Sequence, residues 1–427
     1  MIESIIFFGF VCFITASIAF RYSYDTLHPA IIFSALFSFV YVLQPLVLIA
    51  NDSDKFVLFN GSEDNVITYE FIVLLIFVSL ISGIYVGSRR REMSSSLGYN
   101  ASHLTVLAGL VGLTGAGLSF FYLFSFGGIS EVYGRAYGAV YIADGYISEA
   151  RNMSVVAVPL LFIARKKEGM FWRHWALLGV IISPMLLQAI LGARRGPLIL
   201  VFMLLIGGYV GILRKKIPIV LAAVSVILVG YVALFLVSNR DAIYVGSKAE
   251  FSRGAFEAIK DLYGSEYVYG NSIMRYLLGG GDPFMGRRLF GHILARVIPS
   301  AWWPTKYEEV ASYLNLIGVD FHVNNGVPIG LVGRMTGWMP AVGAAPGFVA
   351  EVCLEFGLAA PVFAFSIGYF FASAWIAARR ESMFSNAVYL LMASMSVYLV
   401  LQSLEAFTYR IILFGIPTLL ISRMVSS

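Results

Sequence analysis

The chain has 427 residues, of which 59% are hydrophobic and 13% charged, and its mean hydropathy is +0.80. Soluble domains carry about 25% charged residues, and disordered chains combine few aromatic residues with a high net charge, so both classes are excluded. The net charge of +5 could suggest a nucleic-acid partner, but the basic residues flank apolar segments instead of lining a soluble helix, which argues against one.

Eleven apolar runs approach the length of about 20 residues that a membrane-spanning helix needs. The runs lie at about 3–20, 29–50, 68–88, 104–127, 147–164, 175–192, 196–213, 217–237, 347–377, 386–404 and 408–424. The ninth run is too long for one upright helix, and we expect Gly357 or Pro361 to break it. The sequence therefore predicts an all-α polytopic membrane protein with about 11 transmembrane helices.

The basic residues of the short loops predict the orientation of these spans. If the spans alternate, fourteen Lys and Arg residues fall on one side, including Arg89-Arg90-Arg91 and Arg214-Lys215-Lys216, and six fall on the other. Because cytoplasmic loops are enriched in Lys and Arg, we expect the N-terminus outside the cytoplasm and the C-terminus inside it.

One predicted outward loop, 238–345 between spans 8 and 9, is far longer than the others. It holds ten Lys and Arg, nine Asp and Glu and fifteen aromatic residues, a composition typical of folded structure. We therefore divide the chain into transmembrane helices 1–8 (1–237), a large outer loop with short helices (238–345) and transmembrane helices 9–11 (346–427). Its aromatic residues could anchor the loop at the membrane interface or stack on sugar rings.

The sequence predicts neither a cofactor nor a metal site. Cys12 and Cys353 lie in separate apolar runs, without the spacing of metal ligands. Asp52-Ser53-Asp54 is the pattern closest to a metal site, but its polar neighbours favour a solvated turn. Nucleotide-binding and metalloprotease motifs are absent from the sequence.

Two arginines separate the sixth and seventh apolar runs, within Gly192-Ala193-Arg194-Arg195-Gly196-Pro197 on the predicted outer side. Guanidinium groups bind phosphate through paired hydrogen bonds and stay charged in a low-dielectric site. Snorkelling toward the interface is the alternative, although basic residues are more typical of the opposite side. We therefore favour phosphate binding by Arg194 and Arg195.

Other arginines on the predicted outer side could join the same anion site. Asn239-Arg240-Asp241 follows the predicted span 217–237, so Arg240 would reach the same rim, although an Arg-Asp neighbour pair is more often structural. Further candidates are Arg287, Arg288, Arg296, Arg334 and Arg410. Several arginines converging on one outward cavity would suit a pyrophosphate.

Glu351 and Glu355 are the acidic candidates for chemistry. They are four residues apart in an apolar helix and therefore share a face, and carboxylates within a span usually face a bundle interior or a water cavity. Glu351 could be a general base for a sugar hydroxyl or an ion-pair partner for an arginine. His322 in the outer loop is the other candidate base, and a polar surface residue is the alternative for it.

These features together resemble the Wzy-type O-antigen polymerases, also called oligosaccharide repeat unit polymerases. The resemblance rests on 192–197, Asn239-Arg240, Ile298-Pro299, Trp303-Pro304-Thr305-Lys306 and the 351–358 stretch, and on the layout of many spans with one late outward loop. It implies a GT-C-like membrane glycosyltransferase in the bacterial inner membrane, with the large loop in the periplasm.

By this resemblance the protein would transfer a growing glycan from undecaprenyl pyrophosphate to the non-reducing end of an incoming lipid-linked repeat unit. Its partners would be the lipid-linked donor and acceptor, the lipid bilayer, and a flippase and a chain-length regulator of the same pathway. Arg194, Arg195 and Arg240 would bind the pyrophosphate, and Glu351 or His322 would be the base. Further substrate contacts would come from Arg287, Arg288, Arg334, Arg410, Glu355 and Trp303.

Three other functions remain as alternatives: a ligase, a transporter, and a non-catalytic assembly partner of a polysaccharide machine. The related O-antigen ligases carry a loop histidine followed by Asn, Ser or Gln, whereas Val323 follows His322 here, and Gly330 and Gly333 come too soon after it. A transporter of lipid-linked sugars would carry repeated halves with charges near mid-membrane. Here the charged residues gather near the predicted outer surface, which favours chemistry at one face.

Overall fold

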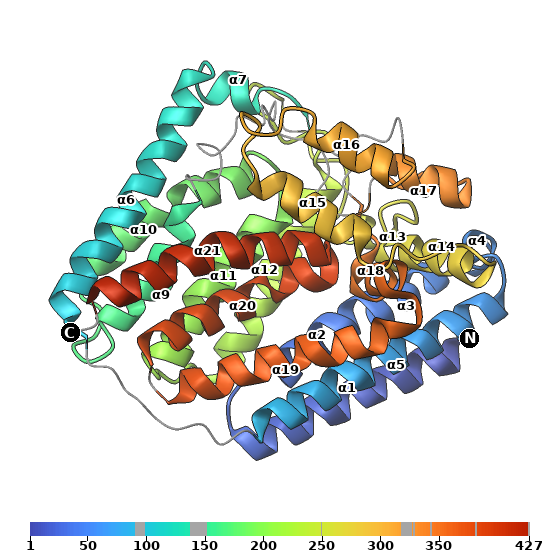
Figure 1. Ribbon diagram of the computed structural model, residues 1–427, viewed down its shortest axis with the longest axis horizontal. Coiled ribbons are helices and arrows are strands. Elements are labelled where there is room, and N and C mark those ends of the chain that lie inside the picture. The colour runs from blue at the N-terminus through green and yellow to red at the C-terminus, as the bar shows by residue number, and fades with distance from the viewer. Residues whose placement is uncertain are drawn as a thin grey trace. The chain divides into compact units, whose positions relative to one another are not determined.

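The computed structural model describes residues 1–89, 99–136, 152–248, 250–316, 327, 329–341, 344–380 and 382–425, and these are built from helices (Figure 1). Ten helical segments are long and apolar enough to cross a membrane, as expected of a multi-pass membrane protein. These segments are Ile2–Ser23, Pro29–Asn51, Glu63–Ser88, Ala101–Ser125, Trp172–Ile190, Arg195–Ile212, Val220–Ser238, Gly347–Arg379, Met383–Leu401 and Leu404–Val425.

The fifth predicted span, 147–164, does not coincide with any of these ten segments. Its described part is helix α9 (Met153–Ala164), which has 12 residues and would be about 18 Å long at 1.5 Å per residue. That is shorter than the hydrocarbon core of about 30 Å. The earlier part of the run, up to residue 151, lies outside the described residues. Asn152 is the N-cap residue of the described helix.

The break expected at Gly357 or Pro361 lies at Gly357. Helix α18 (Gly347–Phe356) ends there, a short 3-10 turn (η3, Gly357–Ala359) follows, and α19 (Ala360–Arg379) begins. Gly357 has φ 54° and ψ −126°, a conformation that side chains with a Cβ rarely adopt. The glycine therefore allows the chain to change direction at the end of α18.

The chain forms two compact units, each assembled from separate stretches of sequence. Unit 1 comprises Met1–Arg91, Ile259–Ser373 and Ser396–Arg410, and unit 2 comprises Glu92–Ala258, Ala374–Met395 and Ile411–Ser427. The predicted outer loop 238–345 is thus shared between them. Its first 21 residues belong to unit 2, and the remainder belongs to unit 1.

Unit 1 contains the N-terminal helices and most of the outer loop. Its first helices are α1 (Ile2–Ser23), α2 (Pro29–Ser38), a π-helical turn η1 (Phe39–Leu43), α3 (Gln44–Asn51), α4 (Ser53–Asn60) and α5 (Glu63–Ser88). The loop adds α13 (Glu257–Lys260, which begins in unit 2), α14 (Glu266–Leu278), α15 (Arg287–Val297), α16 (Lys306–Tyr313) and α17 (Ile329–Thr336). Helix α14 packs against α4, α5, α17 and α18, so much of the loop is part of the packed unit.

Unit 2 is built around α9. The other helices are α6 (Ala101–Ser125), α7 (Ile129–Tyr133), α10 (Trp172–Ile190), α11 (Arg195–Gly207), a π-helical turn η2 (Gly208–Ile212) and α12 (Ile219–Ser238). Helix α9 packs against α6, α10 and α11, and every residue from Ser154 to Ala164 is buried. Helix α19 and the last two helices, α20 (Met383–Leu401) and α21 (Leu404–Val425), contribute residues to both units.

Glycines bring α5 and α19 into backbone contact within unit 1. A Cβ added at Gly83 would overlap the carbonyl oxygen of Phe365, and one added at Gly368 would overlap that of Leu80. Gly83 and Gly87 are four residues apart, the spacing of small residues that lets membrane helices approach closely. The contact therefore depends on side chains smaller than alanine.

We expect Gly83→Leu to lower the free energy of unfolding by about 1–3 kcal/mol, because the new side chain must push two backbones apart. Thermal unfolding of the purified protein in detergent measures this as a lower Tm. Gly117→Leu is the matched control, since nothing lies within 4 Å of a Cβ at that position in α6. Equal Tm values for the two variants would show that α5 and α19 do not depend on close approach.

Candidate functional site

Helix α15 carries three basic side chains on one face. Arg288, His292 and Arg296 are spaced by four residues, so they lie above one another along the helix. The helix ends at Val297, because Pro299 disfavours a helical conformation for Ile298, which is extended at φ −78° and ψ 129°. The result is a basic stripe about two turns long.

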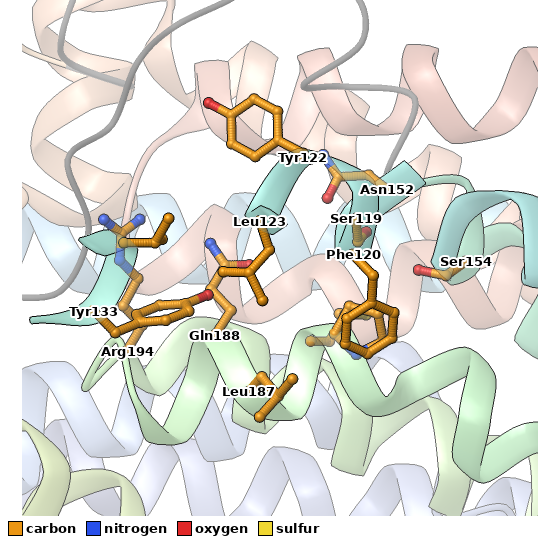
Figure 2. A pocket seen from close by; sticks show the side chains of 13 residues that line it. Ser119, Phe120, Tyr122, Leu123, Tyr133, Asn152, Ser154, Leu187, Gln188 and Arg194 are labelled. Atoms are coloured by element: carbon orange, nitrogen blue, oxygen red, sulfur yellow. The ribbon is translucent and has the colours of Figure 1, made fainter. Parts of the chain in front are cut away.

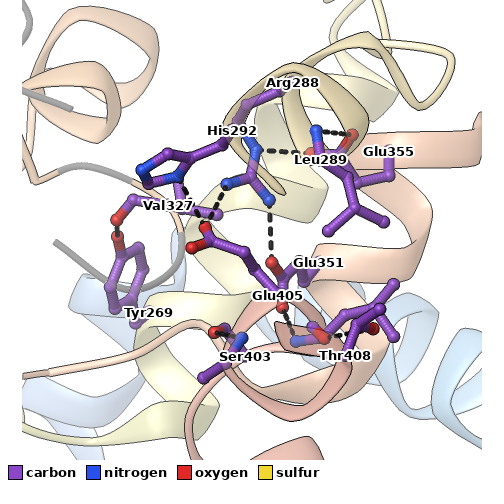
Figure 3. Close-up of polar contacts among 12 residues, drawn as sticks. Tyr269, Arg288, Leu289, His292, Val327, Glu351, Glu355, Ser403, Glu405 and Thr408 are labelled. Carbon is purple, nitrogen blue, oxygen red and sulfur yellow. Dashed lines mark hydrogen bonds and ion pairs between the residues drawn. The ribbon is translucent and has the colours of Figure 1, made fainter. Parts of the chain in front are cut away.

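Acidic side chains of α18 and α21 face this stripe (Figure 3). Arg288 Nη2 lies 2.7 Å from Glu351 Oε1, its Nε donates to Glu355 Oε1, and its Nη1 lies 3.8 Å from Glu405 Oε2. Arg288 and its three carboxylate partners have no exposed side-chain surface. We call these residues, together with His292 and Arg296, the ion-pair network.

The outer end of the network is held by Glu405. His292 Nδ1 and Glu405 Oε2 are 2.8 Å apart, and Arg296 Nη1 lies 3.3 Å from Glu405 Oε1. The Arg296 guanidinium also lies 4.2 Å from the ring centre of Tyr409, within the range of a cation–π contact. Arg296 is 19% exposed, so the network extends from the interior of unit 1 toward its surface.

Burial and charge act in opposite directions on Arg288. Burial alone would lower the pKa of its guanidinium, but the carboxylates of Glu355, Glu351 and Glu405 raise the pKa above its ordinary value. Arg288 therefore stays protonated throughout the physiological pH range. Because its charge is fully paired and has no accessible surface, Arg288 is placed to hold α15 against α18 and α21 and not to bind a soluble anion.

Both carboxylate oxygens of Glu351 are engaged. Oε1 accepts from Arg288 Nη2, and Oε2 accepts from the backbone N–H of Leu404. A general base needs to reach the proton that it takes from the substrate. These contacts favour the ion-pair interpretation of Glu351 over the general-base interpretation. Glu355 is held in the same way, since its Oε2 accepts from the Leu289 N–H at 3.2 Å.

The remaining candidates of unit 1 lie apart from the network. Arg287 is exposed, and its Nε donates to the Phe284 carbonyl at 3.1 Å. Arg334 is exposed on the last turn of α17, and Trp303 Nε1 donates to Glu309 at 2.9 Å. Arg410 donates to the Ala406 carbonyl and lies 4.3 Å from the ring centre of Tyr398. His322 lies outside the described residues.

His292 and Glu405 were not singled out from the sequence, and Arg296 was expected only as one of the outer-loop arginines of an anion site. A signal for His292 was present, because its spacing from Arg288 and Arg296 matches the helical repeat that singled out Glu351 and Glu355. Glu405 carries no such local pattern. It is the second residue of α21, where a carboxylate also interacts favourably with the positive end of the helix dipole.

A second group of candidates meets at the turn between α10 and α11 in unit 2. We call residues 192–197 the arginine turn. Ala193 has φ 46°, which reverses the chain so that Arg194 becomes the N-cap residue of α11 and Arg195 its first residue. Arg240 Nε donates to the Ala193 carbonyl at 3.2 Å, so a third guanidinium group lies at the same turn.

Asn239 explains why Arg240 reaches this turn. It ends α12 and is buried, and its amide nitrogen donates to the carbonyls of Phe235 and Arg253 at 3.1 and 2.9 Å. The Arg253 N–H donates back to Asn239 Oδ1 at 3.3 Å. Asp241 pairs with Arg253 at 3.4 Å, at the surface of unit 2. Asn239 thus fixes the chain after α12.

A pocket with polar and apolar side chains adjoins the arginine turn (Figure 2). Its volume is about 60 Å³, which exceeds that of one water-sized group. Arg194, Gln188 and Tyr133 lie at one end of the view, and Ser154 lies at the other. The lining residues are Ser119, Phe120, Tyr122, Leu123, Val132, Tyr133, Asn152, Ser154, Pro184, Met185, Leu187, Gln188 and Arg194.

Among the described residues that line the pocket are hydroxyl, amide and guanidinium groups and no carboxylate, a composition that suits an anionic ligand. The start of α11 adds the positive end of a helix dipole. In the described part of the chain, no group of three or more His, Cys, Asp or Glu side chains could hold a metal ion. No family model, curated protein or solved structure matches this chain.

Proposed function

We propose that the protein is a membrane glycosyltransferase that joins undecaprenyl-pyrophosphate-linked oligosaccharide repeat units on the periplasmic face of the bacterial inner membrane. One observation carries the proposal: Arg240 is hydrogen-bonded to the arginine turn, beside a pocket whose described lining includes guanidinium, amide and hydroxyl groups and no carboxylate. The multi-pass helical architecture supports a lipid-linked substrate. The GT-C-like fold remains part of this proposal.

In the proposed reaction a hydroxyl oxygen of the acceptor sugar bonds to the anomeric carbon of the growing glycan. The bond from that carbon to the pyrophosphate oxygen breaks, and the lipid pyrophosphate leaves with the electron pair. Arg194, Arg195 and Arg240 stabilise its charge, so the reaction needs no metal. Because both oxygens of Glu351 are engaged, the base that takes the hydroxyl proton is His322 in this proposal.

Contacts within unit 1 support eleven membrane crossings. The rings of Phe59 and Tyr263 are 5.1 Å apart, and Asn271 Nδ2 donates to Asn60 Oδ1 at 2.7 Å, so the segments around α4 and α14 lie on the same side of the membrane. An even number of crossings must therefore separate them. Five of the candidate spans lie between them, namely α5, α6, α10, the segment formed by α11 and η2, and α12.

The sixth crossing is α9 in this proposal. Near the start of α6, Tyr99 Oη donates to the Ile163 carbonyl at the end of α9 at 3.0 Å. Near the end of α6, Ser119 lines the same pocket as Ser154 at the start of α9. Helix α9 thus runs antiparallel to α6. With the loop charges, this topology puts the arginine turn on the periplasmic side and the C-terminus in the cytoplasm.

Incubation of the purified protein with a lipid-linked repeat unit tests the proposal. We expect a ladder of products that differ by one repeat unit, and we expect the ladder to persist in a metal chelator. Product formed only with a lipid A-core acceptor would instead identify a ligase. Unchanged substrate, together with uptake of the unit by proteoliposomes, would identify a transporter. The flippase and the chain-length regulator are not needed for the first ladder in this assay.

A further inference from the structure

A second cavity lies in unit 1, in residues that the proposed reaction does not use. It has a volume of about 530 Å³, within the range of about 300–1,000 Å³ that is usual for ligand sites. We call it the aromatic groove. Its lining residues are Leu58, Phe59, Tyr263, Ser272, Arg275, Tyr276, Met335, Thr336 and Trp338.

The aromatic groove lies outside the membrane-spanning segments. Its residues come from α4, from α14 and the residue Tyr263 before it, and from the end of α17, and none of these belongs to the ten candidate spans. In the proposed topology the groove opens on the periplasmic side, where the glycan of a lipid-linked unit is located.

The aromatic rings of the groove are held in fixed positions. Tyr263 and Trp338 are stacked, with ring centres 6.2 Å apart and an interplanar angle of 18°. The buried ring of Tyr269 supports Trp338 edge-on at 5.9 Å. The Ala341 N–H donates to the Tyr263 carbonyl at 2.9 Å, which ties the two ring-bearing segments together. Tyr263 is 49% exposed, so a ligand can reach its ring.

Arg275 gives the groove a polar side. It is exposed, and its Nη1 donates to the Phe59 carbonyl at 3.4 Å. A guanidinium group has five N–H donors, so most of them remain for a ligand. Ser272 and Thr336 add hydroxyl groups, and no carboxylate is among the described residues that line the groove. The groove thus combines flat apolar faces with donors for oxygen atoms.

A sugar ring matches both parts of the groove, because it has an apolar face of C–H groups and an edge of hydroxyl oxygens. We infer that the aromatic groove binds an oligosaccharide, with sugar rings on Tyr263 and Trp338 and an oxygen atom accepting from Arg275. Binding of an oligosaccharide follows from the groove alone. Its identity as the glycan of the repeat unit rests on the proposed function.

The test uses the full chain in lipid nanodiscs, because maltoside detergents carry sugar headgroups that would compete. The probe is an array of lipid-free bacterial oligosaccharides, both neutral and acidic. We expect the wild type to bind at least one of them, and Tyr263→Ala and Trp338→Ala to weaken that binding about tenfold or more through loss of ring contacts. Trp302→Ala is the control, because Trp302 is 82% exposed and lies outside the groove.

Arg275→Met refines the result. If it removes only the binding of acidic glycans, Arg275 recognises a sugar carboxylate, and if it weakens all binding, Arg275 recognises hydroxyl groups; both outcomes support the inference. Wild-type protein that binds no glycan on the array, or Trp338→Ala and Trp302→Ala proteins that bind equally well, would overturn it. If the protein forms a ladder from lipid-linked units but binds no glycan on the array, the inference about the aromatic groove fails while the proposed function stands.

Discussion

Replacing Arg288 by alanine is expected to lower the free energy of unfolding by about 3–5 kcal/mol, the usual cost of breaking a buried ion pair by removing one partner. The structure gives the reason. Glu351 and Glu355 have no exposed side-chain surface, and each accepts a hydrogen bond from the Arg288 guanidinium. Without it, both carboxylates stay buried beside an apolar methyl group, and water cannot reach them without opening α15 away from α18.

Thermal unfolding in detergent measures the effect as a large loss of Tm and of folded yield. Arg287→Ala is the matched control, because the neighbouring arginine on the same helix is exposed and makes one hydrogen bond, to a carbonyl. The Arg287 variant should unfold within about 0.5 kcal/mol of the wild type. If both variants unfolded alike, the ion-pair network would not hold α15 in place.

A combined variant keeps this prediction testable when the single variant does not fold. Arg288→Met with Glu351→Gln and Glu355→Gln removes all three charges together and leaves no unpaired carboxylate at these positions. Replacing a buried charge cluster by neutral side chains of similar volume is often neutral or stabilising. We therefore expect the triple variant to be more stable than Arg288→Ala, and the difference measures the cost of the unpaired charges.

Most of the membrane-spanning helices could be predicted from the sequence, because the hydropathy and length of each depend only on consecutive residues. Ten of the eleven predicted runs coincide, within a few residues at each end, with a helical segment long enough to cross a membrane. The exception, α9, has a fully buried surface and is short. Its role depends on which helices surround it, and this is information that a hydropathy window does not contain.

The candidate site likewise combines features that helical spacing predicts with contacts between residues far apart in the sequence. The shared face of Glu351 and Glu355 follows from helical spacing, but their partner Arg288 lies more than sixty residues earlier and could not be singled out from the other arginines. Asn239 was noticed only as a neighbour of Arg240. Its role in fixing the chain depends on Arg253, fourteen residues later, because hydrogen bonds across a loop leave no periodic pattern.

Removal of Arg195 or Arg240 is expected to reduce the rate of polymer formation about a hundredfold, the usual loss when one group that stabilises charge in the transition state is removed. The position of the arginines at the start of α11 makes this prediction specific. Cationic side chains at the start of a helix are repelled by its dipole, and yet Arg194 and Arg195 occupy the N-cap and first position of α11. An anion bound at this turn, as proposed, would offset this repulsion, so the proposal expects these arginines to contribute to binding and not to the stability of α11.

Activity and stability should therefore separate. We expect Arg195→Ala to lose the ladder of products while its Tm equals or slightly exceeds that of the wild type, since α11 loses an unfavourable charge. Arg240→Lys should retain part of the activity, because lysine keeps the charge but lacks the planar guanidinium group, whose Nε donates to the Ala193 carbonyl.

Arg253→Ala is the control for this comparison. Arg253 lies in the same unit, and its exposed side chain pairs with Asp241 at the surface, so its removal should leave both the ladder and the Tm unchanged. Full-length polymer made by Arg195→Ala and Arg240→Ala proteins at normal expression would refute the pyrophosphate site at the arginine turn. Loss of Tm in parallel with loss of activity would instead give these arginines a structural role, because an anion-binding role requires the folded protein to survive their removal.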